Sequence, residues 1–327
     1  MAGAWKAVDQ LLRAAVTDAF PDAQLLVVDQ GELVFHEAVG NASTSTRFDL
    51  ASLTKPFCTA ALVLRLVAQG KLRLEDRPRS ECTIEQLLCH AGGLLAVKPL
   101  ADPADPSELT RATAIEAART EPLVYEPGTR SVYSDLGFIL LGDAIERATG
   151  ERLDDSFIEQ IAAPAEAYIG FGPLAGNVAP TEGVPPGEVH DDNARAMQGI
   201  AGHAGLFGRA RSVSQLVEKW VNAWHGDASI FEPPLVRRAW DNAGIPGSTW
   251  GLGWDHPSIE NSSAGASWPR SGVGHLGFTG CSVWIDPPRK RWVILLSNRV
   301  HPSRTNENIK VFRPRVHDAI FAALEPR

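Results

Sequence analysis

The most informative stretch of the sequence lies at residues 48–70 and reads FDLASLTKPFCTAALVLRLVAQG. From Ser52 to about Gln69 the residues are apolar on nearly every side of a helix, and Gly70 follows where that helix can end. This pattern predicts a buried central helix. Ser52 and Lys55 lie three residues apart at its beginning, so they share one face of the helix.

A serine and a lysine at this spacing can form a nucleophile and its activating partner. The N–H groups in the first turn of a helix lack intrahelical partners and can stabilise a negatively charged oxygen. A lysine removed from water has a lowered pKa and can accept or relay a proton. The spacing alone is weak evidence, because chance supplies about one such pair in a chain of this length.

Strands are predicted both before and after this helix. Residues 24–28 and 33–39 have the pattern of a hairpin, because residues 29–32 between them favour a turn. Late in the chain, short strands are predicted at 250–254, 273–278, 282–286 and 292–297. Segments with helical spacing separate the two blocks. The order predicts an α+β protein, with an antiparallel sheet built from both chain ends and flanked by helices.

We expect one catalytic domain of two lobes over residues 1–327. Residues 1–50 and 248–327 are expected to form an α/β sheet lobe, and residues 51–247 a mostly helical lobe with long loops. Within the helical lobe, one helix is expected from about Glu108 to Arg119. The sequence does not define the shape of the substrate pocket, because that shape depends on the loops.

The composition favours a small-molecule partner. The chain has a formal net charge of -8, so nucleic acid and anionic membrane surfaces are not expected as partners. Its most apolar run, residues 57–68, contains Arg65 and is shorter than the roughly 20 residues of a membrane-spanning helix. No signal peptide is visible, so a cytoplasmic protein is expected. The oligomeric state does not follow from the sequence.

Two further motifs stand near predicted strand and helix boundaries. Tyr133-Ser134-Asp135 comes directly before a helical pattern that begins near Leu136, so Tyr133 can be presented from a loop. His275-Leu276-Gly277 lies in the late strand block, where a glycine would let a substrate approach the main chain closely. Each motif alone has an ordinary structural explanation, as a packed aromatic residue or a glycine-rich strand connection.

Together, the SxxK pattern, the Tyr-Ser-Asp triplet and the His-Leu-Gly strand resemble the signature set of the serine β-lactamases and penicillin-binding proteins. Further matches extend across nearly the whole chain, at residues 48–55, 83–90, 125–129, 202–207 and 274–287. The chain is similar to the class C branch, which holds β-lactamases, esterases, D-amino-acid peptidases and transesterases on one scaffold. The resemblance implies a β-lactamase/transpeptidase-like fold.

The resemblance also implies roles for individual residues. Ser52 would be the nucleophile, Lys55 its activating partner, and Tyr133 the general base and acid. The backbone N–H groups of Ser52 and Phe278 would form the oxyanion hole. The residues expected to bind substrate are Asp135, His203, Trp254, His275, Leu276 and Gly277. The implied reaction cleaves an ester, amide or lactam through an acyl-serine and needs no cofactor.

Three positions depart from the family pattern. Leu276 stands where the family usually has threonine or serine, which removes a hydroxyl that could bind a substrate carboxylate. His275 replaces a permanently charged lysine with a group expected to titrate near neutrality. Both changes argue against a penicillin-like substrate that bears a carboxylate. Asp135 replaces an asparagine and is expected to hold Lys55 charged, which leaves proton abstraction to Tyr133.

Other readings stay open. An acyltransferase or a D-amino-acid peptidase would use the same acyl-enzyme, and a non-catalytic penicillin-binding or scaffold protein would keep the pocket without turnover. Intact Ser52, Lys55 and Tyr133 argue against the scaffold. No metal is predicted, because no ligand motif accompanies His190, Asp191 and His203. These residues are expected to order loops beside the site, where Asp191 or His203 could contact substrate.

Overall fold

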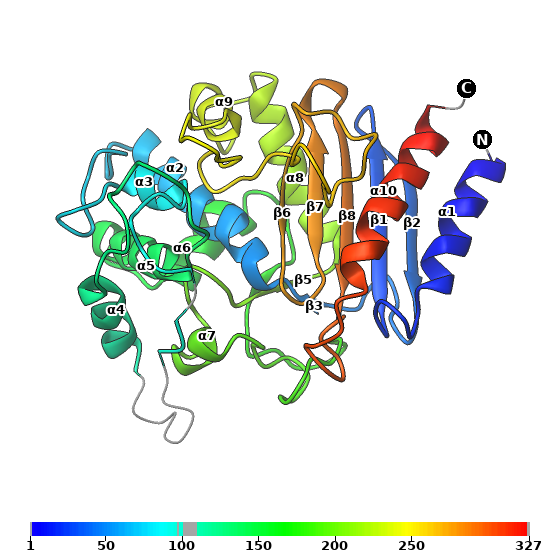
Figure 1. Cartoon of the computed structure of the whole chain (residues 1–327), viewed down its shortest axis with the longest axis horizontal. Helices are drawn as coiled ribbons and strands as arrows, with labels where there is room; N and C mark the ends of the chain where they lie inside the picture. Colours follow the sequence, from blue (N-terminus) through cyan, green and yellow to red (C-terminus); the bar gives the residue numbers. More distant parts are fainter. Residues whose placement is uncertain (1, 97, 101–109, 326–327) are drawn as a thin grey trace.

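The centre of the structure, a computed structural model that describes residues 2–96, 98–100 and 110–325, is a five-stranded antiparallel sheet (Figure 1). Its strand order is β2-β1-β8-β7-β6. The strands are β1 (Ala23–Asp29), β2 (Glu32–Val39), β6 (Val273–Leu276), β7 (Ser282–Asp286) and β8 (Arg291–Ser297). The two chain ends therefore build one sheet, which confirms the predicted α+β architecture.

The predicted hairpin between β1 and β2 is confirmed. Gln30 and Gly31 form its turn with φ values of 53° and 83°, the left-handed conformation of the tight hairpin turns that favour glycine. The N–H of Gly31 donates to the carbonyl of Lys290 at 2.9 Å, which ties this hairpin to the turn between β7 and β8. That turn contains a 3₁₀ segment, Pro287–Arg289.

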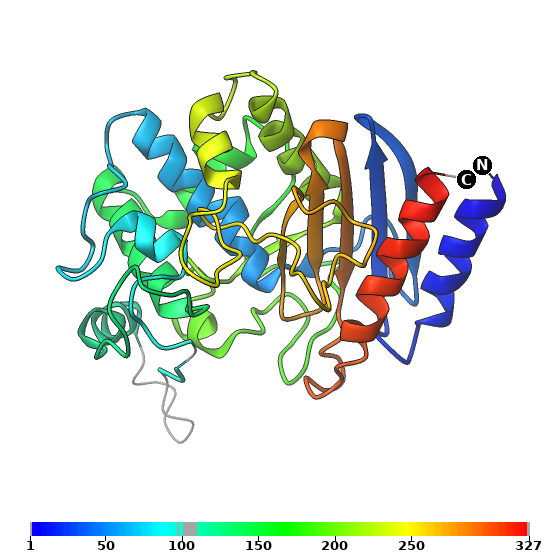
Figure 2. The same ribbon diagram turned by 45° about the horizontal axis from the view of Figure 1, so that its top comes forward.

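Both faces of the sheet are covered, because its central strands are apolar on both sides. Leu25 and Val27 of β1 pack toward helices α1 (Ala2–Ala14) and α10 (Ile309–Leu324), which lie side by side (Figures 1 and 2). Alternate residues of β1 pack into the larger core on the other face. Helix α8 (Ala210–Trp224) covers that second face, although the sequence assigned it to the helical lobe.

The predicted central helix is continuous but is built from three kinds of turn. A 3₁₀ turn, Ala51–Leu53, is followed by a π-helical segment, Lys55–Ala60, and by α2, Ala61–Ala68. By length and composition alone residues 51–68 could cross a membrane, but 78% of the stretch is buried within the protein. The core of the fold therefore accounts for its apolar side chains.

The remaining elements surround this helix on the side of the sheet away from α1 and α10 (Figure 1). The helices are α3 (Ile84–Leu88), α4 (Arg111–Thr120), α5 (Asp135–Thr149), α6 (Leu153–Phe157) with a π segment Ile158–Ala162, α7 (Asp192–Ala196) and α9 (Pro233–Trp240). A small second sheet has the order β3 (Phe48–Asp49), β5 (Leu206–Gly208), β4 (Gly170–Phe171). The expected start of a helix at Glu108 lies outside the described residues.

One strand prediction is wrong. Residues 250–254 form no strand, and only an isolated bridge joins Trp250 to Asp255. Gly251 and Gly253 interrupt this stretch, and Gly253 has a φ of 78°, which is incompatible with an extended strand. The result places Trp250 on an irregular loop.

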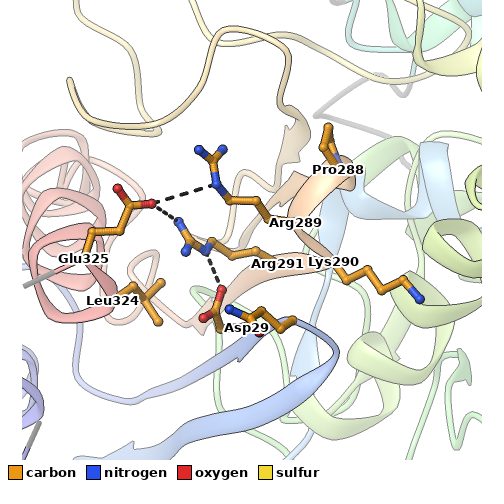
Figure 3. A pocket seen from close by; sticks show the side chains of 8 residues that line it. Asp29, Pro288, Arg289, Lys290, Arg291, Leu324 and Glu325 are labelled. Carbon is orange, nitrogen blue, oxygen red and sulfur yellow. Dashed lines mark hydrogen bonds and ion pairs between the residues drawn. The ribbon is translucent and has the colours of Figure 1, made fainter.

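An ion-pair network at one end of the main sheet joins β1, β8 and the end of α10. The buried Arg291 guanidinium lies between the carboxylates of Asp29, at 2.7 Å, and Glu325, at 3.1 Å (Figure 3). A pocket of about 530 Å³ lies there, between the two hairpin turns and the end of α10. None of the residues that line it belongs to the predicted catalytic site.

Candidate active site

Ser52 follows a residue with an uncommon backbone conformation. Ala51 has a φ of 47°, a left-handed conformation that costs a non-glycine residue about 1–2 kcal/mol. The Asp49 carboxylate supports this bend, because its two oxygens accept hydrogen bonds from the N–H groups of Ala51 and His190, each at 2.8 Å. Burial raises the pKa of Asp49 to about 6, against the opposing effect of these bonds. These hydrogen bonds therefore fix the backbone turn that leads from β3 to Ser52.

Lys55 is fully buried and uses every donor of an ammonium group. Its Nζ donates to Ser52 Oγ at 3.0 Å, to Asp135 Oδ1 at 2.7 Å and to the carbonyl of His203 at 3.1 Å. Three acceptors match the three N–H donors of a protonated lysine. Burial alone would lower the pKa of Lys55, but the Asp135 carboxylate and Tyr133 raise it above its ordinary value. The geometry thus supports a charged lysine at neutral pH.

Tyr133 lies beside both of these groups. Lys55 Nζ is 4.8 Å from the centroid of its ring. Burial raises the pKa of Tyr133, while the Lys55 ammonium and the Ser52 hydroxyl, both close to its phenol, oppose that rise. The structure therefore brings the hydroxyl at 52, the amine at 55 and the phenol at 133 together, as the resemblance implies.

His90 packs against the ring of Tyr133 and bonds to the backbone of the next residue. Its Nδ1 accepts a hydrogen bond from the N–H of Ser134 at 3.0 Å, and its ring centroid lies 4.5 Å from that of Tyr133. Burial, followed by the charge of Lys55, lowers the pKa of His90 well below its usual range. His90 is thus a neutral residue that positions the start of α5. The sequence motif at 83–90 included it, but nothing in the pattern indicated this contact.

His275 forms the strand side of the site, but it does not titrate near neutrality. Its Nδ1 bonds to the carbonyl of Leu276 at 2.8 Å, and its side chain is 1% exposed. Burial, and then the charge of Lys55, lowers its pKa to about 3. The prediction of a titrating histidine is therefore wrong, because burial keeps the imidazole neutral.

The turn after β6 brings Phe278 toward the nucleophile. Thr279 Oγ1 donates to the carbonyl of Asp49 at 2.7 Å, which fastens this turn to the residues before Ser52. Neither the N–H of Ser52 nor that of Phe278 donates a hydrogen bond to another described residue. Both donors are available to an oxyanion, and that role stays a prediction.

Gly277 allows the turn after β6 to pack closely against the main chain before Ser52. A Cβ atom at this position would lie 2.6 Å from the carbonyl oxygen of Leu50, which is main chain and cannot move freely. The sequence predicts that this glycine lets a substrate approach the main chain, and the contact with Leu50 gives it a packing role. A substrate contact of Gly277 is not needed for this explanation.

Two buried arginines hold the same turn. Arg299 Nε donates to the carbonyl of Phe278 at 2.8 Å, and its guanidinium lies 4.4 Å from the centroid of the Phe278 ring. Arg313 Nη2 donates to the carbonyls of Gly277, at 3.3 Å, and Cys281, at 2.8 Å. Burial lowers the pKa of Arg313 to about 10, which leaves it charged at neutral pH. The motifs in the sequence did not point to either arginine.

Trp254 lies in the core of the protein. Its side chain is 0% exposed and packs edge-on against Phe57, Trp220 and Trp240, with centroid distances of 5.3 to 5.8 Å. The prediction of a stacking role is wrong, because α8 and α9 enclose this ring in the core. Trp250 is the aromatic residue at the site, with its ring 5.6 Å from Tyr133 and 5.4 Å from His275.

The burial of Trp254 leads to a stability prediction. Trp254→Ala should lower the free energy of unfolding by about 3–5 kcal/mol, because it removes a large buried side chain and leaves a cavity in the core. Chemical denaturation followed by circular dichroism measures this change. A loss below about 1 kcal/mol would show that the ring is not enclosed as described.

The two remaining predicted substrate contacts differ in position. Leu276 is half-buried and packs against the cluster beneath α10, on the opposite face of β6 from His275. His203 reaches the site through its carbonyl, which accepts from Lys55, and its ring Nε2 lies 2.9 Å from Asp191 Oδ1. Among the residues that the structure describes, no three histidine, cysteine or acidic side chains are grouped to hold a metal ion.

Comparisons with known proteins identify the family and the fold of this chain. A provisionally named D-alanyl-D-alanine carboxypeptidase of Escherichia coli is 27% identical, over 90% of this chain and 82% of that protein. An N-acetylmuramyl-L-alanine amidase of Bacillus subtilis is 28% identical, over 90% of this chain and 80% of that protein. The solved structure of EstCE1, a hydrolase with promiscuous acyltransferase activity, shares the fold with a TM-score of 0.78 and 21% identity, over 97% of this chain and 98% of that one. The model of the Beta-lactamase family matches residues 8–313, and the chain belongs to that family.

Proposed function

We propose that this protein is a serine hydrolase that cleaves an ester or amide through an acyl-serine intermediate. The observation that carries the proposal is the fully bonded Lys55 ammonium, which contacts Ser52 Oγ at 3.0 Å beside the phenol of Tyr133. Because Lys55 donates to Ser52, the serine hydroxyl is free to donate its own proton elsewhere. The oxygen of Tyr133 in its ionised form, which the charge of Lys55 favours, is the nearby group that can accept it.

The proposed reaction moves one proton through Tyr133. Tyr133 reacts as its phenolate, whose negative charge the Lys55 ammonium stabilises; Ser52 Oγ attacks the carbonyl carbon while its proton passes to the phenolate oxygen, which becomes a neutral phenol. The carbonyl oxygen becomes an oxyanion that the N–H groups of Ser52 and Phe278 can bind. Tyr133 then protonates the leaving alcohol or amine, and the acyl group stays on Ser52. Water, activated in the same way, releases it.

The groups around the reacting atoms favour a substrate without a carboxylate next to the scissile bond. His275 is neutral, and Leu276 carries no hydroxyl and packs away from His275. A penicillin or a peptide with a free carboxylate would lack the two partners that the family usually provides. Simple esters and amides do not need these partners.

A substrate panel tests the proposal. The purified protein is incubated with p-nitrophenyl butyrate, with a fluorescent penicillin and with a peptide that ends in D-alanyl-D-alanine. We expect steady release of nitrophenol and slow or no reaction of the other two compounds. Added alcohols show whether the acyl group is also transferred. Failure to react with any ester, amide or lactam would leave a non-catalytic binding protein and refute the proposal.

Asp135→Asn should change the pH dependence of this reaction. The Asp135 carboxylate raises the pKa of Lys55 while burial lowers it, so without the carboxylate the lysine loses its proton at lower pH. Below the pKa of the variant's lysine the ammonium persists and activity remains. The alkaline limb of the kcat/KM profile should therefore move to lower pH. Profiles from pH 6 to 11 measure the shift, and an unchanged limb would contradict the role of Asp135.

A further inference from the structure

The side chains around the nucleophile divide into buried supports and partly exposed surfaces. His90 and His275 are 2% and 1% exposed, so solvent and substrate barely reach them. Ser52, Tyr133 and Trp250 are partly exposed. The proposed reaction uses Ser52 and Tyr133, but it gives Trp250 no role. A substrate that reaches the serine is therefore expected to meet the indole as well.

Trp250 packs directly against the residues that surround the reacting atoms. Its ring centroid lies 5.6 Å from that of Tyr133, 5.4 Å from that of His275 and 4.5 Å from that of His90. The rings of Tyr133 and His275 are themselves 6.1 Å apart, so the four rings form one cluster. The exposed part of Trp250 therefore adjoins the residue that transfers the proton.

Backbone hydrogen bonds fix the loop that carries Trp250. The N–H of Trp250 donates to Ser248 Oγ at 3.1 Å, and its carbonyl accepts from the N–H of Ala243 at 3.0 Å. Further along the loop, Asp255 and Gly274 exchange two backbone hydrogen bonds of 2.8 Å each, which ties the loop to β6. An aromatic ring held in this way loses little freedom when a ligand packs on it.

The path of the proton indicates which part of a substrate lies on this ring. In the proposed reaction Tyr133 protonates the leaving alcohol or amine, so the atom that leaves must lie within hydrogen-bond reach of the phenol oxygen. The carbonyl oxygen points instead to the N–H groups of Ser52 and Phe278. Because Trp250 packs on Tyr133, the leaving group is the part of the substrate that extends over the indole.

The surface beside Tyr133 favours an apolar group. The charge of Lys55 is paired with Asp135 at 2.7 Å, and burial lowers the pKa of His275 to about 3, so this imidazole is neutral. An indole attracts apolar groups because contact removes area from water, and it attracts aromatic rings through stacked or edge-to-face contacts. An aromatic leaving group gains both contributions here, whereas a short polar one gains neither.

We propose that Trp250 binds the leaving group of the substrate, so that the preferred substrates are esters and amides of apolar aromatic alcohols and amines. This inference rests on the proposed acyl-serine reaction and names the substrate class of the same site. Trp250 acts as a specificity residue that contacts substrate. The acyl group still passes to Ser52, and the aromatic alcohol or amine departs with the proton from Tyr133.

Two esters that form the same acyl-enzyme test this inference. Benzyl butyrate and methyl butyrate both leave a butyryl group on Ser52, and their alcohols have nearly equal acidity, so the comparison isolates the phenyl ring. We expect kcat/KM, measured by titration of the released acid, to be about 10- to 50-fold higher for the benzyl ester. Trp250→Ala should lower this benzyl-to-methyl ratio about 5- to 10-fold. Trp250→Phe keeps an aromatic ring and should retain most of the ratio.

Two controls separate recognition of the leaving group from general damage. Trp224→Ala removes an indole that packs on His225 at the end of α8, and it should leave the benzyl-to-methyl ratio unchanged. The ratio of benzyl butyrate to benzyl acetate varies the acyl side, and Trp250→Ala should not alter it. Each ratio is measured on one preparation, so a partial loss of folded protein cancels, and thermal unfolding shows how much of each variant is folded.

Several outcomes would overturn the inference without touching the proposed function. Benzyl butyrate that reacts no faster than methyl butyrate would show that the ring is not recognised, and a preference that survives Trp250→Ala would assign its recognition to another residue. A change confined to the butyrate-to-acetate ratio would place Trp250 on the acyl side. In each case hydrolysis that depends on Ser52 keeps the proposed function intact. If ester hydrolysis does not depend on Ser52, the proposed function fails first, and the inference fails with it.

Discussion

Ser52→Ala should abolish the turnover of p-nitrophenyl butyrate, with a loss in kcat on the order of 10⁴-fold or more. The alanine lacks the oxygen that forms the acyl bond, and among the described residues no other serine or threonine hydroxyl accepts a hydrogen bond from Lys55 Nζ. The substitution removes one half-buried atom, so thermal unfolding should change little. Initial rates at saturating ester measure the effect.

A matched serine provides the control for this variant. Ser229 is exposed in the loop before α9 and donates no side-chain hydrogen bond to another described residue, so Ser229→Ala should keep full activity. A Ser52→Ala protein that retains more than about a tenth of the rate would require another nucleophile. The account of catalysis given above would then be wrong.

Tyr133→Phe should lower kcat by about 10²- to 10⁴-fold, the usual contribution of a positioned acid–base group. The phenyl ring keeps the packing against His90 and Trp250, so the loss isolates the oxygen. Stability should change by less than about 1 kcal/mol. Stopped-flow measurement of the nitrophenol burst should show slower acylation, because the proton of Ser52 has lost its acceptor.

Tyr168→Phe is the corresponding control. Tyr168 is 68% exposed and, among the described residues, shares no ring contact with Tyr133, so its hydroxyl should be dispensable. If Tyr133→Phe acylates at the unchanged rate, Tyr133 does not take the proton, and Lys55 or Asp135 would have to do so. That result would also contradict the charged state of Lys55 inferred from its three acceptors.

The elements with strong local patterns could be predicted from the sequence. The hairpin of β1 and β2 and the helix after Ser52 follow from apolar periodicity and from glycines at turns, both of which are local. The convergence of Ser52, Lys55 and Tyr133 followed from the family resemblance rather than from any local rule. Spacing in the sequence cannot bring residues 55 and 133 together.

The incorrect predictions about the site concern burial, which depends on elements far apart in the chain. Trp254 and Trp250 stand four residues apart, yet only the packing of α8 and α9 decides that the former is in the core and the latter at the site. The pKa of His275 depends on burial and on the charge of Lys55, more than 200 positions away. Arg299 and Arg313 reach the Phe278 turn from the C-terminal segment, and no motif marks that contact.

The central claim is that Ser52 carries the acyl group. The most direct measurement is the mass of the protein after reaction with p-nitrophenyl butyrate, quenched in acid within milliseconds, followed by peptide mapping. We predict one butyryl group per chain, located on the peptide that contains Ser52 and absent from the Ser52→Ala protein. A butyryl group on any other residue, or turnover with no acylated protein at any quench time, would contradict the account.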